Sequence, residues 1–263
     1  MLEEFRTTII HKDEFICKDF IREKCQDVVV ANMITADMIK KITKPTIFVT
    51  GCDYTIDEKT FRSVDCENIK VWFAHNVLYK HPKLHSLPVA LPNPSNNKTA
   101  SNFKVIEEAN SKEKNIRNLA YIGFRDDTFI GERSKVRKLF EGKNFVSTAD
   151  YDKTCRNGDY YTDKGYRGYI NDIYNHKFVF SPRGNGVDCH RHWESLYLRT
   201  IPIIKKDSIM EFAKDLPILF VNDWEEALDV SYLEKKYDEI MNKEYDLGIL
   251  KLSFWIEKIK GYS

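Results

Sequence analysis

The chain of 263 residues is 42% hydrophobic and 13% aromatic, so it can bury a substantial core and is not a disordered chain. Its 41 Lys and Arg residues nearly balance its 40 Asp and Glu residues, which gives a net charge of +1. This balance excludes nucleic-acid or anionic-membrane binding that depends on bulk electrostatic attraction.

Cysteine usage and the apolar pattern predict a soluble, cytoplasmic protein. The six cysteines are scattered and none forms a C-x-x-C pair, so the sequence predicts neither a disulfide framework nor a zinc ribbon. The start, MLEEFRTTIIHKDEF, lacks the basic lead and apolar run of a signal peptide. No apolar run approaches the ~20 residues of a membrane span.

Apolar runs in the first part of the chain predict strands separated by helical or irregular segments. The runs are VVVANMI within Asp27–Ile34, Thr46–Gly51, Ile69–Ala74 and the shorter Leu84–Leu91, and Ala36–Ile42 has the pattern of an amphipathic helix. This alternation predicts an α/β domain with a parallel sheet.

A polar tract follows over Pro92–Asn115, rich in Asn, Ser and Lys, with two prolines near its start. Such composition favours a surface connection with one helical piece and a domain boundary. We therefore expect one domain over residues 1–105 and a second over residues 106–263.

The second domain is predicted to open with a strand over Leu119–Phe124, a helix over Glu132–Phe140 and a strand over Phe145–Ala149. The tract Tyr151–Tyr169, rich in Tyr, Asp, Lys and Gly, predicts a long loop. Later elements are expected to be helices over Lys206–Lys214, Glu225–Val230, Tyr232–Asn242 and Leu247–Ile259, and a strand over Pro217–Val221.

The segment Phe178–Ile204 is predicted to form strand, glycine loop, helix and strand. Gly184 and Gly186 in the loop allow backbone conformations that are closed to other residues. Asp188 is a suitable N-cap for a helix over about Cys189–Arg199. A glycine loop that leads into a helix presents free N–H groups and the positive end of the helix dipole, which suits a phosphate.

Polar residues around this loop strengthen the phosphate interpretation. Arg183 lies in the loop, and Arg191 lies near the start of the helix; two guanidinium forks match a diphosphate. Glu194 could accept hydrogen bonds from ribose hydroxyls, as the acidic residue of dinucleotide folds does. The alternative is that Arg191 and Glu194, three residues apart, form only a surface ion pair.

The pattern Ser-Pro-Arg-Gly-Asn-Gly-x-Asp-x-x-Arg-x-x-Glu-(x)5-Thr-Ile-Pro-Ile resembles the donor-binding segment of exostosin-like glycosyltransferases. The resemblance covers about residues 177–224. It implies the compact GT-B architecture, in which two Rossmann-like domains face each other across a cleft and the last helix can pack back on the first domain. Arg199 departs from the family, which usually has Gly there, and this leaves the tightness of the turn open.

The resemblance also implies a donor site. It would comprise the strand-ending Gly123, Arg133 at the start of the next helix, and the loop and helix residues Arg183, Gly184, Asn185, Gly186, Asp188, Arg191 and Glu194. Arg137 is the alternative to Arg133, and a solvated helix face is the alternative for both. The donor would be a UDP- or GDP-sugar and the acceptor a glycan or glycoprotein. Transfer would be inverting, with no metal and no further cofactor.

Inverting transfer needs a base that takes the proton of the acceptor hydroxyl. Asp53 and His75 each follow a predicted strand of the first domain, where a parallel sheet gathers its ligand-binding residues. Asp57 is a weaker third possibility. The structural alternatives are a turn or helix cap for the aspartate and a hydrogen-bonded loop position for the histidine.

Two other functions remain open. Asp150 and Asp152 form the only Asp-x-Asp of the chain, and such a pair holds a divalent metal on the donor diphosphate in GT-A glycosyltransferases. A chain without a base would instead be a non-catalytic nucleotide-sugar-binding protein. Cys189 and His192 share a helix face, but two ligands are too few for the usual zinc set.

Overall fold

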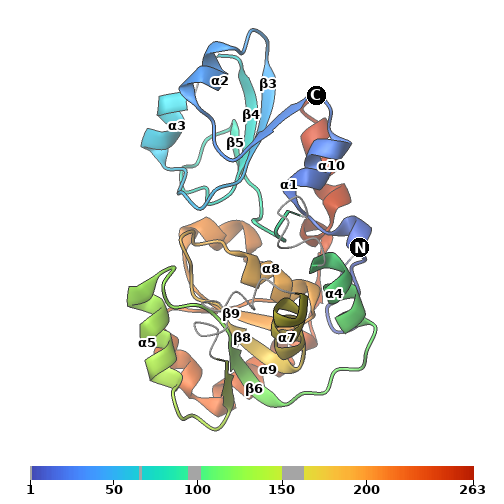
Figure 1. Cartoon of the computed structure of the whole chain (residues 1–263), viewed down its shortest axis with the longest axis vertical. Helices are drawn as coiled ribbons and strands as arrows, with labels where there is room; N and C mark the ends of the chain where they lie inside the picture. The colour runs from blue at the N-terminus through green and yellow to red at the C-terminus, as the bar shows by residue number, and fades with distance from the viewer. Residues whose placement is uncertain (1, 65–66, 94–101, 150–162) are drawn as a thin grey trace.

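The computed structural model describes residues 2–64, 67–93, 102–149 and 163–263. Two parallel β-sheets dominate it, one in the upper and one in the lower part of Figure 1. Sheet N has the order β2-β3-β4-β5 and contains β2 (Val28–Ala31), β3 (Thr46–Thr50), β4 (Ile69–Ala74) and β5 (Leu84–Ser86). The two short strands β1 (Glu3–Glu4) and β11 (Glu244–Tyr245) pair antiparallel.

Sheet C has the order β10-β9-β8-β6-β7. Its strands are β6 (Asn118–Ile122), β7 (Val146–Thr148), β8 (His176–Phe180), β9 (Ile201–Lys205) and β10 (Leu219–Val221). Helices flank both sheets (Figure 1), so the predicted α/β class with parallel sheets is confirmed.

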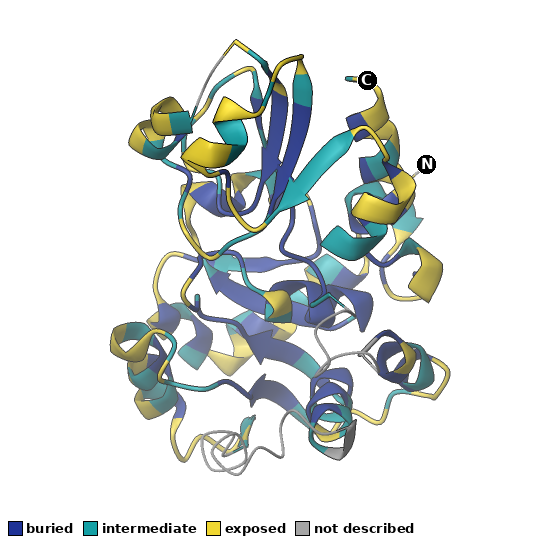
Figure 2. Ribbon diagram, turned by 45° about the horizontal axis from the view of Figure 1, so that its top comes forward, coloured by how far each residue is buried: buried dark blue, intermediate teal, exposed yellow. Residues whose placement is uncertain are grey.

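Alternating side chains of sheet N enter two different hydrophobic clusters, as the pleat of a strand requires. Val49 and Phe73 join a cluster with residues of α1 (Lys18–Lys24) and α10 (Leu252–Lys260). Phe48 and Trp72 join a second cluster with residues of α2 (Ala36–Lys40) and α3 (Glu58–Val64). Sheet N is therefore covered on both faces, and its central strands are buried (Figure 2).

The C-terminal helix α10 lies beside α1 (Figure 1), although the two helices are near opposite ends of the chain. Just after it, the Tyr262 ring lies 5.8 Å from the Phe73 ring. The Tyr262 hydroxyl is 3.0 Å from Nε2 of His85. The end of the chain thus packs on the sheet formed by the beginning of the chain.

The helices around sheet C lie on opposite sides of it, because the chain reverses direction across the sheet after β7 and crossovers are right-handed. Helix α5 (Ile130–Phe140) connects β6 to β7 on one side, and α7 (Asp163–Tyr174) leads to β8 on the other, where it contacts α8 (His190–Tyr197). The remaining elements are α4 (Asn102–Asn110), which contacts α7, α9 (Val230–Met241), and the 3-10 helices η1 (Lys12–Glu14), η3 (Ser208–Ala213), η4 (Trp224–Leu228) and η5 (Gly248–Leu250).

The predicted loop Tyr151–Tyr169 is wrong over its second part, because α7 begins at Asp163; residues 150–162 lie outside the described ranges. Tyr166, Tyr169, Ile170 and Ile173 recur at helical spacing and are all buried. This apolar stripe outweighs the low helix propensity of the two glycines in the helix.

The strand order of sheet C creates a place for a ligand. Strand β6 has β7 on one side and β8 on the other, so the loops that leave the carboxyl ends of β6 and β8 run in opposite directions. Open parallel sheets bind ligands in the crevice at such a switch point. The loop after β8 is the glycine loop of the sequence analysis.

Helix α8 ends in a Schellman motif at Arg199. The Arg199 N–H donates to Leu196 O at 3.0 Å, and the Thr200 N–H donates to Ser195 O at 2.9 Å. Arg199 has a φ of 53°, the left-handed conformation that favours glycine at this position. The turn therefore has the left-handed conformation that glycine usually supplies, although an arginine occupies it.

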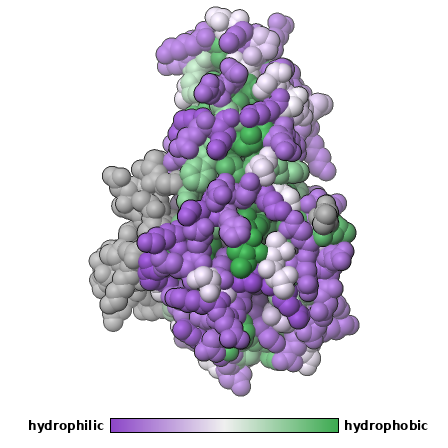
Figure 3. Space-filling view, turned by 90° about the vertical axis from the view of Figure 1, so that its right-hand side faces the viewer, coloured by the Kyte–Doolittle hydropathy of each residue, from purple (hydrophilic) through white to green (hydrophobic). Residues whose placement is uncertain are grey.

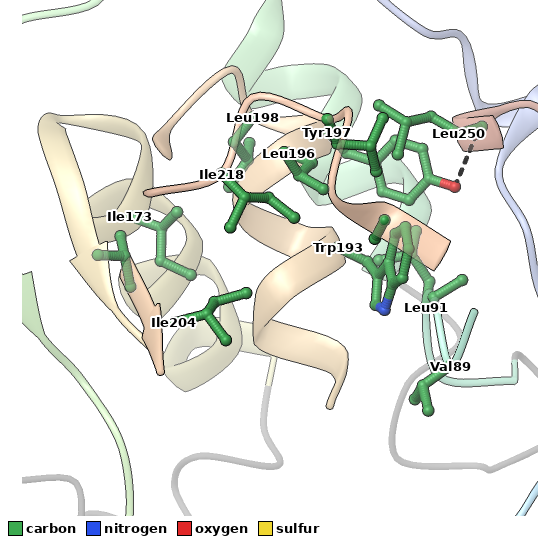
Figure 4. Close-up of a cluster of buried hydrophobic side chains, with 14 of the residues drawn as sticks. Val89, Leu91, Ile173, Trp193, Leu196, Tyr197, Leu198, Ile204, Ile218 and Leu250 are labelled. Atoms are coloured by element: carbon green, nitrogen blue, oxygen red, sulfur yellow. Dashed lines mark hydrogen bonds between the residues drawn. The ribbon is translucent and has the colours of Figure 1, made fainter. Parts of the chain in front are cut away.

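Side-chain contacts explain why an arginine can hold this position. Its guanidinium donates to Arg6 O at 3.2 Å, to Asn110 Oδ1 at 3.3 Å and to the Tyr174 hydroxyl at 3.1 Å. Nearby, the Tyr197 hydroxyl donates to Leu250 O at 2.9 Å (Figure 4). The end of α8 thus joins the two ends of the chain to sheet C.

Hydrophilic side chains cover most of the face in Figure 3, which is the right-hand side of Figure 1, and hydrophobic groups reach it in a strip along its middle. Among the residues that the structure describes, no helix combines the length and the apolar character needed to cross a membrane.

Arg199→Gly and Arg199→Ala separate backbone strain from side-chain contacts. Both variants lose the guanidinium contacts, but only glycine relieves the left-handed strain, which costs an alanine roughly 1–2 kcal/mol. We expect the glycine variant to be about 1 kcal/mol more stable than the alanine variant in urea unfolding. An alanine variant of equal or greater stability would contradict the strain at this turn.

Candidate functional site

The start of α8 is built differently from the prediction. Asp188 is not the N-cap: Cys189 occupies that position, without a side-chain capping bond. The Asp188 carboxylate instead accepts from the Val89 N–H at 2.8 Å and from the Trp193 Nε1–H at 2.6 Å. Its backbone N–H donates to Asn76 Oδ1 at 2.9 Å. Burial raises the pKa of Asp188 to about 7, although His192 beside it acts in the opposite direction.

Asp188 thereby fastens the loop after β8 to two loops of sheet N. Val89 follows β5, and Asn76 follows β4. A buried carboxylate is costly unless N–H donors surround it, so these contacts hold the two sheets at one relative position in this structure.

Gly184 and Gly186 are required for a reason other than the predicted one. Neither has a positive φ. A Cβ on Gly184 would lie 2.9 Å from Nη2 of Arg133, and a Cβ on Gly186 would lie 2.6 Å from Nδ2 of Asn76. The glycines therefore permit close approach by two side chains, and the prediction of unusual backbone conformations is wrong.

Arg133 lies at the predicted place but holds protein carbonyls. Its Nε–H donates to Arg183 O at 2.7 Å and its Nη1–H to Arg125 O at 2.7 Å, and the residue is only 5% exposed. It therefore joins the loop after β6 to the loop after β8. Burial, and secondarily Arg191, lower the pKa of Arg133 to about 10, and the group stays cationic at neutral pH.

Four arginines gather at the switch point of sheet C, around two phenylalanines of the loop after β6. The guanidinium carbons of Arg133, Arg137 and Arg191 lie 5.5, 5.2 and 5.2 Å from the centre of the Phe124 ring. That of Arg183 lies 4.5 Å from the centre of the Phe129 ring. Asp126 binds Arg137. This is a concentrated positive region of the kind that binds phosphate oxygens.

Glu194 is buried, and both of its carboxylate oxygens are engaged. It accepts from the Tyr166 hydroxyl at 2.9 Å and from the Tyr169 hydroxyl at 2.8 Å. Glu194 is thus not in a surface ion pair with Arg191, which was the alternative prediction. A ribose would have to share the carboxylate with two tyrosines.

Three cavities follow one another along the carboxyl ends of the strands. The sheet N cavity, about 340 Å³, is lined by Lys18, Asn32, His75 and His190 among others. The central cavity, about 690 Å³, shares Asp53 with it and reaches Phe129 and Asn185. The sheet C cavity, about 240 Å³, is lined by residues that include Phe129, Glu132, Arg183 and Lys205. Arg191 and Glu194 line none of these three.

The other predicted donor residues lie near these cavities. Asn185 is exposed, and its Nδ2–H donates to Asp53 Oδ2 at 3.3 Å across the central cavity. Gly123 follows β6, and a Cβ there would lie 2.4 Å from the Tyr121 ring. The structure thus brings Asn185 and Asp53 together, whereas Gly123 serves close packing.

The predicted bases differ in exposure. Asp53 is exposed in the central cavity. His75 is buried, and burial together with Lys18 lowers its pKa to about 3, which makes it a weak base. Asp57 is a helix cap: its Oδ1 accepts from the Thr60 N–H at 2.7 Å, and this bond lowers its pKa.

The structure tests the two metal hypotheses only in part. Asp150 and Asp152 lie outside the described residues. Cys189 Sγ lies 3.5 Å from His192 Nε2. Within the described ranges, no three His, Cys, Asp or Glu side chains group as metal ligands would.

Sequence reasoning missed Lys18, Glu132 and His190 as cavity residues, and Tyr166 and Tyr169 as partners of Glu194. The helical spacing of the two tyrosines with the other apolar residues of α7 could have indicated that they share a buried helix face. Nothing in the sequence indicates that Lys18, more than thirty residues before Gly51, donates to the Gly51 carbonyl at 3.0 Å.

Comparison with models of known protein families and with curated protein sequences finds no match to this chain.

The burial of His75 predicts a pH dependence of stability. Because its folded-state pKa of about 3 lies below the unfolded value of 6.5, the unfolded chain binds more protons as pH falls below 6.5, and the folded state loses stability. From pH 7 to pH 5 this amounts to about 2 kcal/mol. His75→Gln should therefore lose about 2 kcal/mol less than the wild type over this range in urea unfolding.

His11→Gln, at an exposed histidine, is the matched control. Equal pH dependence in the wild type and His75→Gln would show that His75 is not held neutral by burial.

Proposed function

We propose that this protein is a glycosyltransferase that transfers a sugar from a UDP- or GDP-sugar to a hydroxyl of a glycan or glycoprotein. The observation that carries the proposal is the gathering of Arg133, Arg137, Arg183 and Arg191 at the switch point of a parallel sheet, beside the start of α8. The resemblance of residues 177–224 to exostosin-like enzymes supports the same conclusion.

In this proposal sheets N and C belong to two Rossmann-like domains that face each other in the compact GT-B manner. The donor nucleotide occupies the sheet C cavity, where Arg183, Lys205 and Lys206 supply positive charge and Phe129 an aromatic face. Its sugar extends into the central cavity. Lysine and arginine side chains and the dipole of α8 then stabilise the diphosphate that leaves, which requires no metal.

Transfer with inversion also requires a base near the acceptor. Of the two bases proposed from the sequence, His75 is too weak, since its pKa is lowered to about 3. Asp53 borders both the sheet N cavity and the central cavity, where its carboxylate accepts from the Asn185 Nδ2–H and is placed to hold the acceptor by a hydrogen bond.

Arg183→Ala and Arg191→Ala test the donor site. A charge-assisted hydrogen bond contributes about 1.5–3 kcal/mol, so Arg183→Ala, which removes a side chain of the sheet C cavity, should bind UDP and GDP at least tenfold more weakly by calorimetry. Arg191 lines none of the three cavities, so Arg191→Ala should weaken binding less. Arg117→Ala is the control, because Arg117 pairs with Asp172 next to the amino end of β6, away from the switch point.

Wild-type affinity in both variants would overturn the donor site. The same titrations with excess EDTA, followed by assays of nucleoside diphosphate release from UDP- and GDP-sugars, test the two alternatives. Loss of activity in EDTA would favour the metal-dependent GT-A hypothesis with Asp150 and Asp152. Binding without any release would favour a non-catalytic binding protein.

A further inference from the structure

His190, at the first turn of α8, reaches into the sheet N cavity. Of the residues that line this cavity within the described part of the chain, it alone comes from beyond Asn93. The others come from α1 or follow the strands of sheet N. His190 is also exposed, whereas His75, which borders the same cavity, is buried.

The ring of His190 is oriented by one hydrogen bond. Its Nδ1 lies 2.7 Å from Ala90 O, and because a carbonyl oxygen only accepts, Nδ1 carries the proton. In the neutral imidazole, Nε2 is then the nitrogen with a lone pair available to a ligand. Among the described residues, none hydrogen-bonds to Nε2, and the His190 residue is exposed.

The carbonyl that holds this ring belongs to a strained residue. Ala90 has a φ of 49°, a left-handed conformation that is unfavourable for alanine. Neighbouring contacts maintain it: the Val89 N–H donates to Asp188, and Leu91 N–H donates to Ile16 O at 3.2 Å. Backbone strain that surrounding contacts enforce is concentrated at functional positions.

Charged and polar groups complete the cavity around His190. Lys18 donates to Asn32 Oδ1 at 2.7 Å and to Gly51 O at 3.0 Å, and its ammonium has a third N–H for a ligand. Arg22 pairs with Asp19. Asp53 lines both this cavity and the central cavity, whereas His75 lines only this one of the two. A cavity lined by side chains of both charge signs and by other hydrogen-bonding groups suits the hydroxyl groups of a sugar.

We propose that the sheet N cavity holds the acceptor sugar and that His190 is the general base of transfer; this rests on the glycosyltransferase function proposed above. The acceptor hydroxyl gives its proton to Nε2 of His190 while its oxygen forms a bond to the anomeric carbon of the donor. The bond from that carbon to the phosphate oxygen breaks, and its electron pair leaves with the nucleoside diphosphate. The imidazolium then releases its proton to solvent.

His190→Asn tests this assignment, because the asparagine Nδ2–H can keep the hydrogen bond to Ala90 O while no basic nitrogen remains. Donor binding, measured with UDP and GDP by calorimetry, should stay within threefold of the wild type. Nucleoside diphosphate release from the UDP- or GDP-sugars that the wild type turns over should fall at least 100-fold, as loss of a general base predicts. Added imidazole should partly restore the activity of His190→Ala.

Two further readouts exclude a purely structural role. The wild-type rate should rise with pH along an acid limb that is absent in His190→Asn. NMR of protein labelled with ¹⁵N-histidine, assigned with the variant, should show His190 protonated at Nδ1. His11→Asn is the control for the loss of an exposed histidine.

An active wild type with a His190→Asn variant within threefold of it would overturn the base assignment and leave the proposed function standing. A wild type that releases no nucleoside diphosphate from any UDP- or GDP-sugar would overturn both.

Discussion

The buried carboxylate of Asp188 is the interaction on which the arrangement of this molecule depends. It lies between the two sheets, and its partners come from both parts of the molecule. Val89 follows β5 of sheet N, and Trp193 lies within α8, which follows β8 of sheet C. An ionised carboxylate in an apolar interior is costly unless donors satisfy it. Two N–H donors and the nearby start of α8 offset part of this cost, and only when the loop after β8 meets the segment after β5; the rest appears as the raised pKa of Asp188.

This contact brings the functional groups of both halves to one place. The carboxyl ends of sheet N and the switch point of sheet C open onto successive cavities, with Asp53 and Asn185 in contact between them. Arg133 donates to carbonyl oxygens of the loops after β6 and β8, and in this way it positions the other arginines. The N–H groups that it uses for this are not available to a ligand. The glycines matter because Arg133 and Asn76 approach the backbone closely.

Local patterns predicted most of the strands, because buried parallel strands are short apolar runs with clear ends. The predicted strand Ile69–Ala74 coincides with β4. Helix α7 was missed because its glycines and polar residues concealed an apolar stripe of tyrosines and isoleucines. The N-cap at Asp188 failed for a different reason: a distant backbone N–H and an indole N–H compete for the same carboxylate, and neither is visible in the local sequence.

By itself, the sequence determined the α/β class and the strand–loop–helix unit around Gly184, since these depend on contacts between near neighbours. Only the tertiary structure decided which partners the candidate site residues contact. Glu194 is held by two tyrosines, Asp57 caps a helix, and His190 faces a cavity formed by sheet N. Each of these outcomes depends on segments tens of residues away or on competing partners, and a side chain's burial and hydrogen-bonding partners set its chemistry.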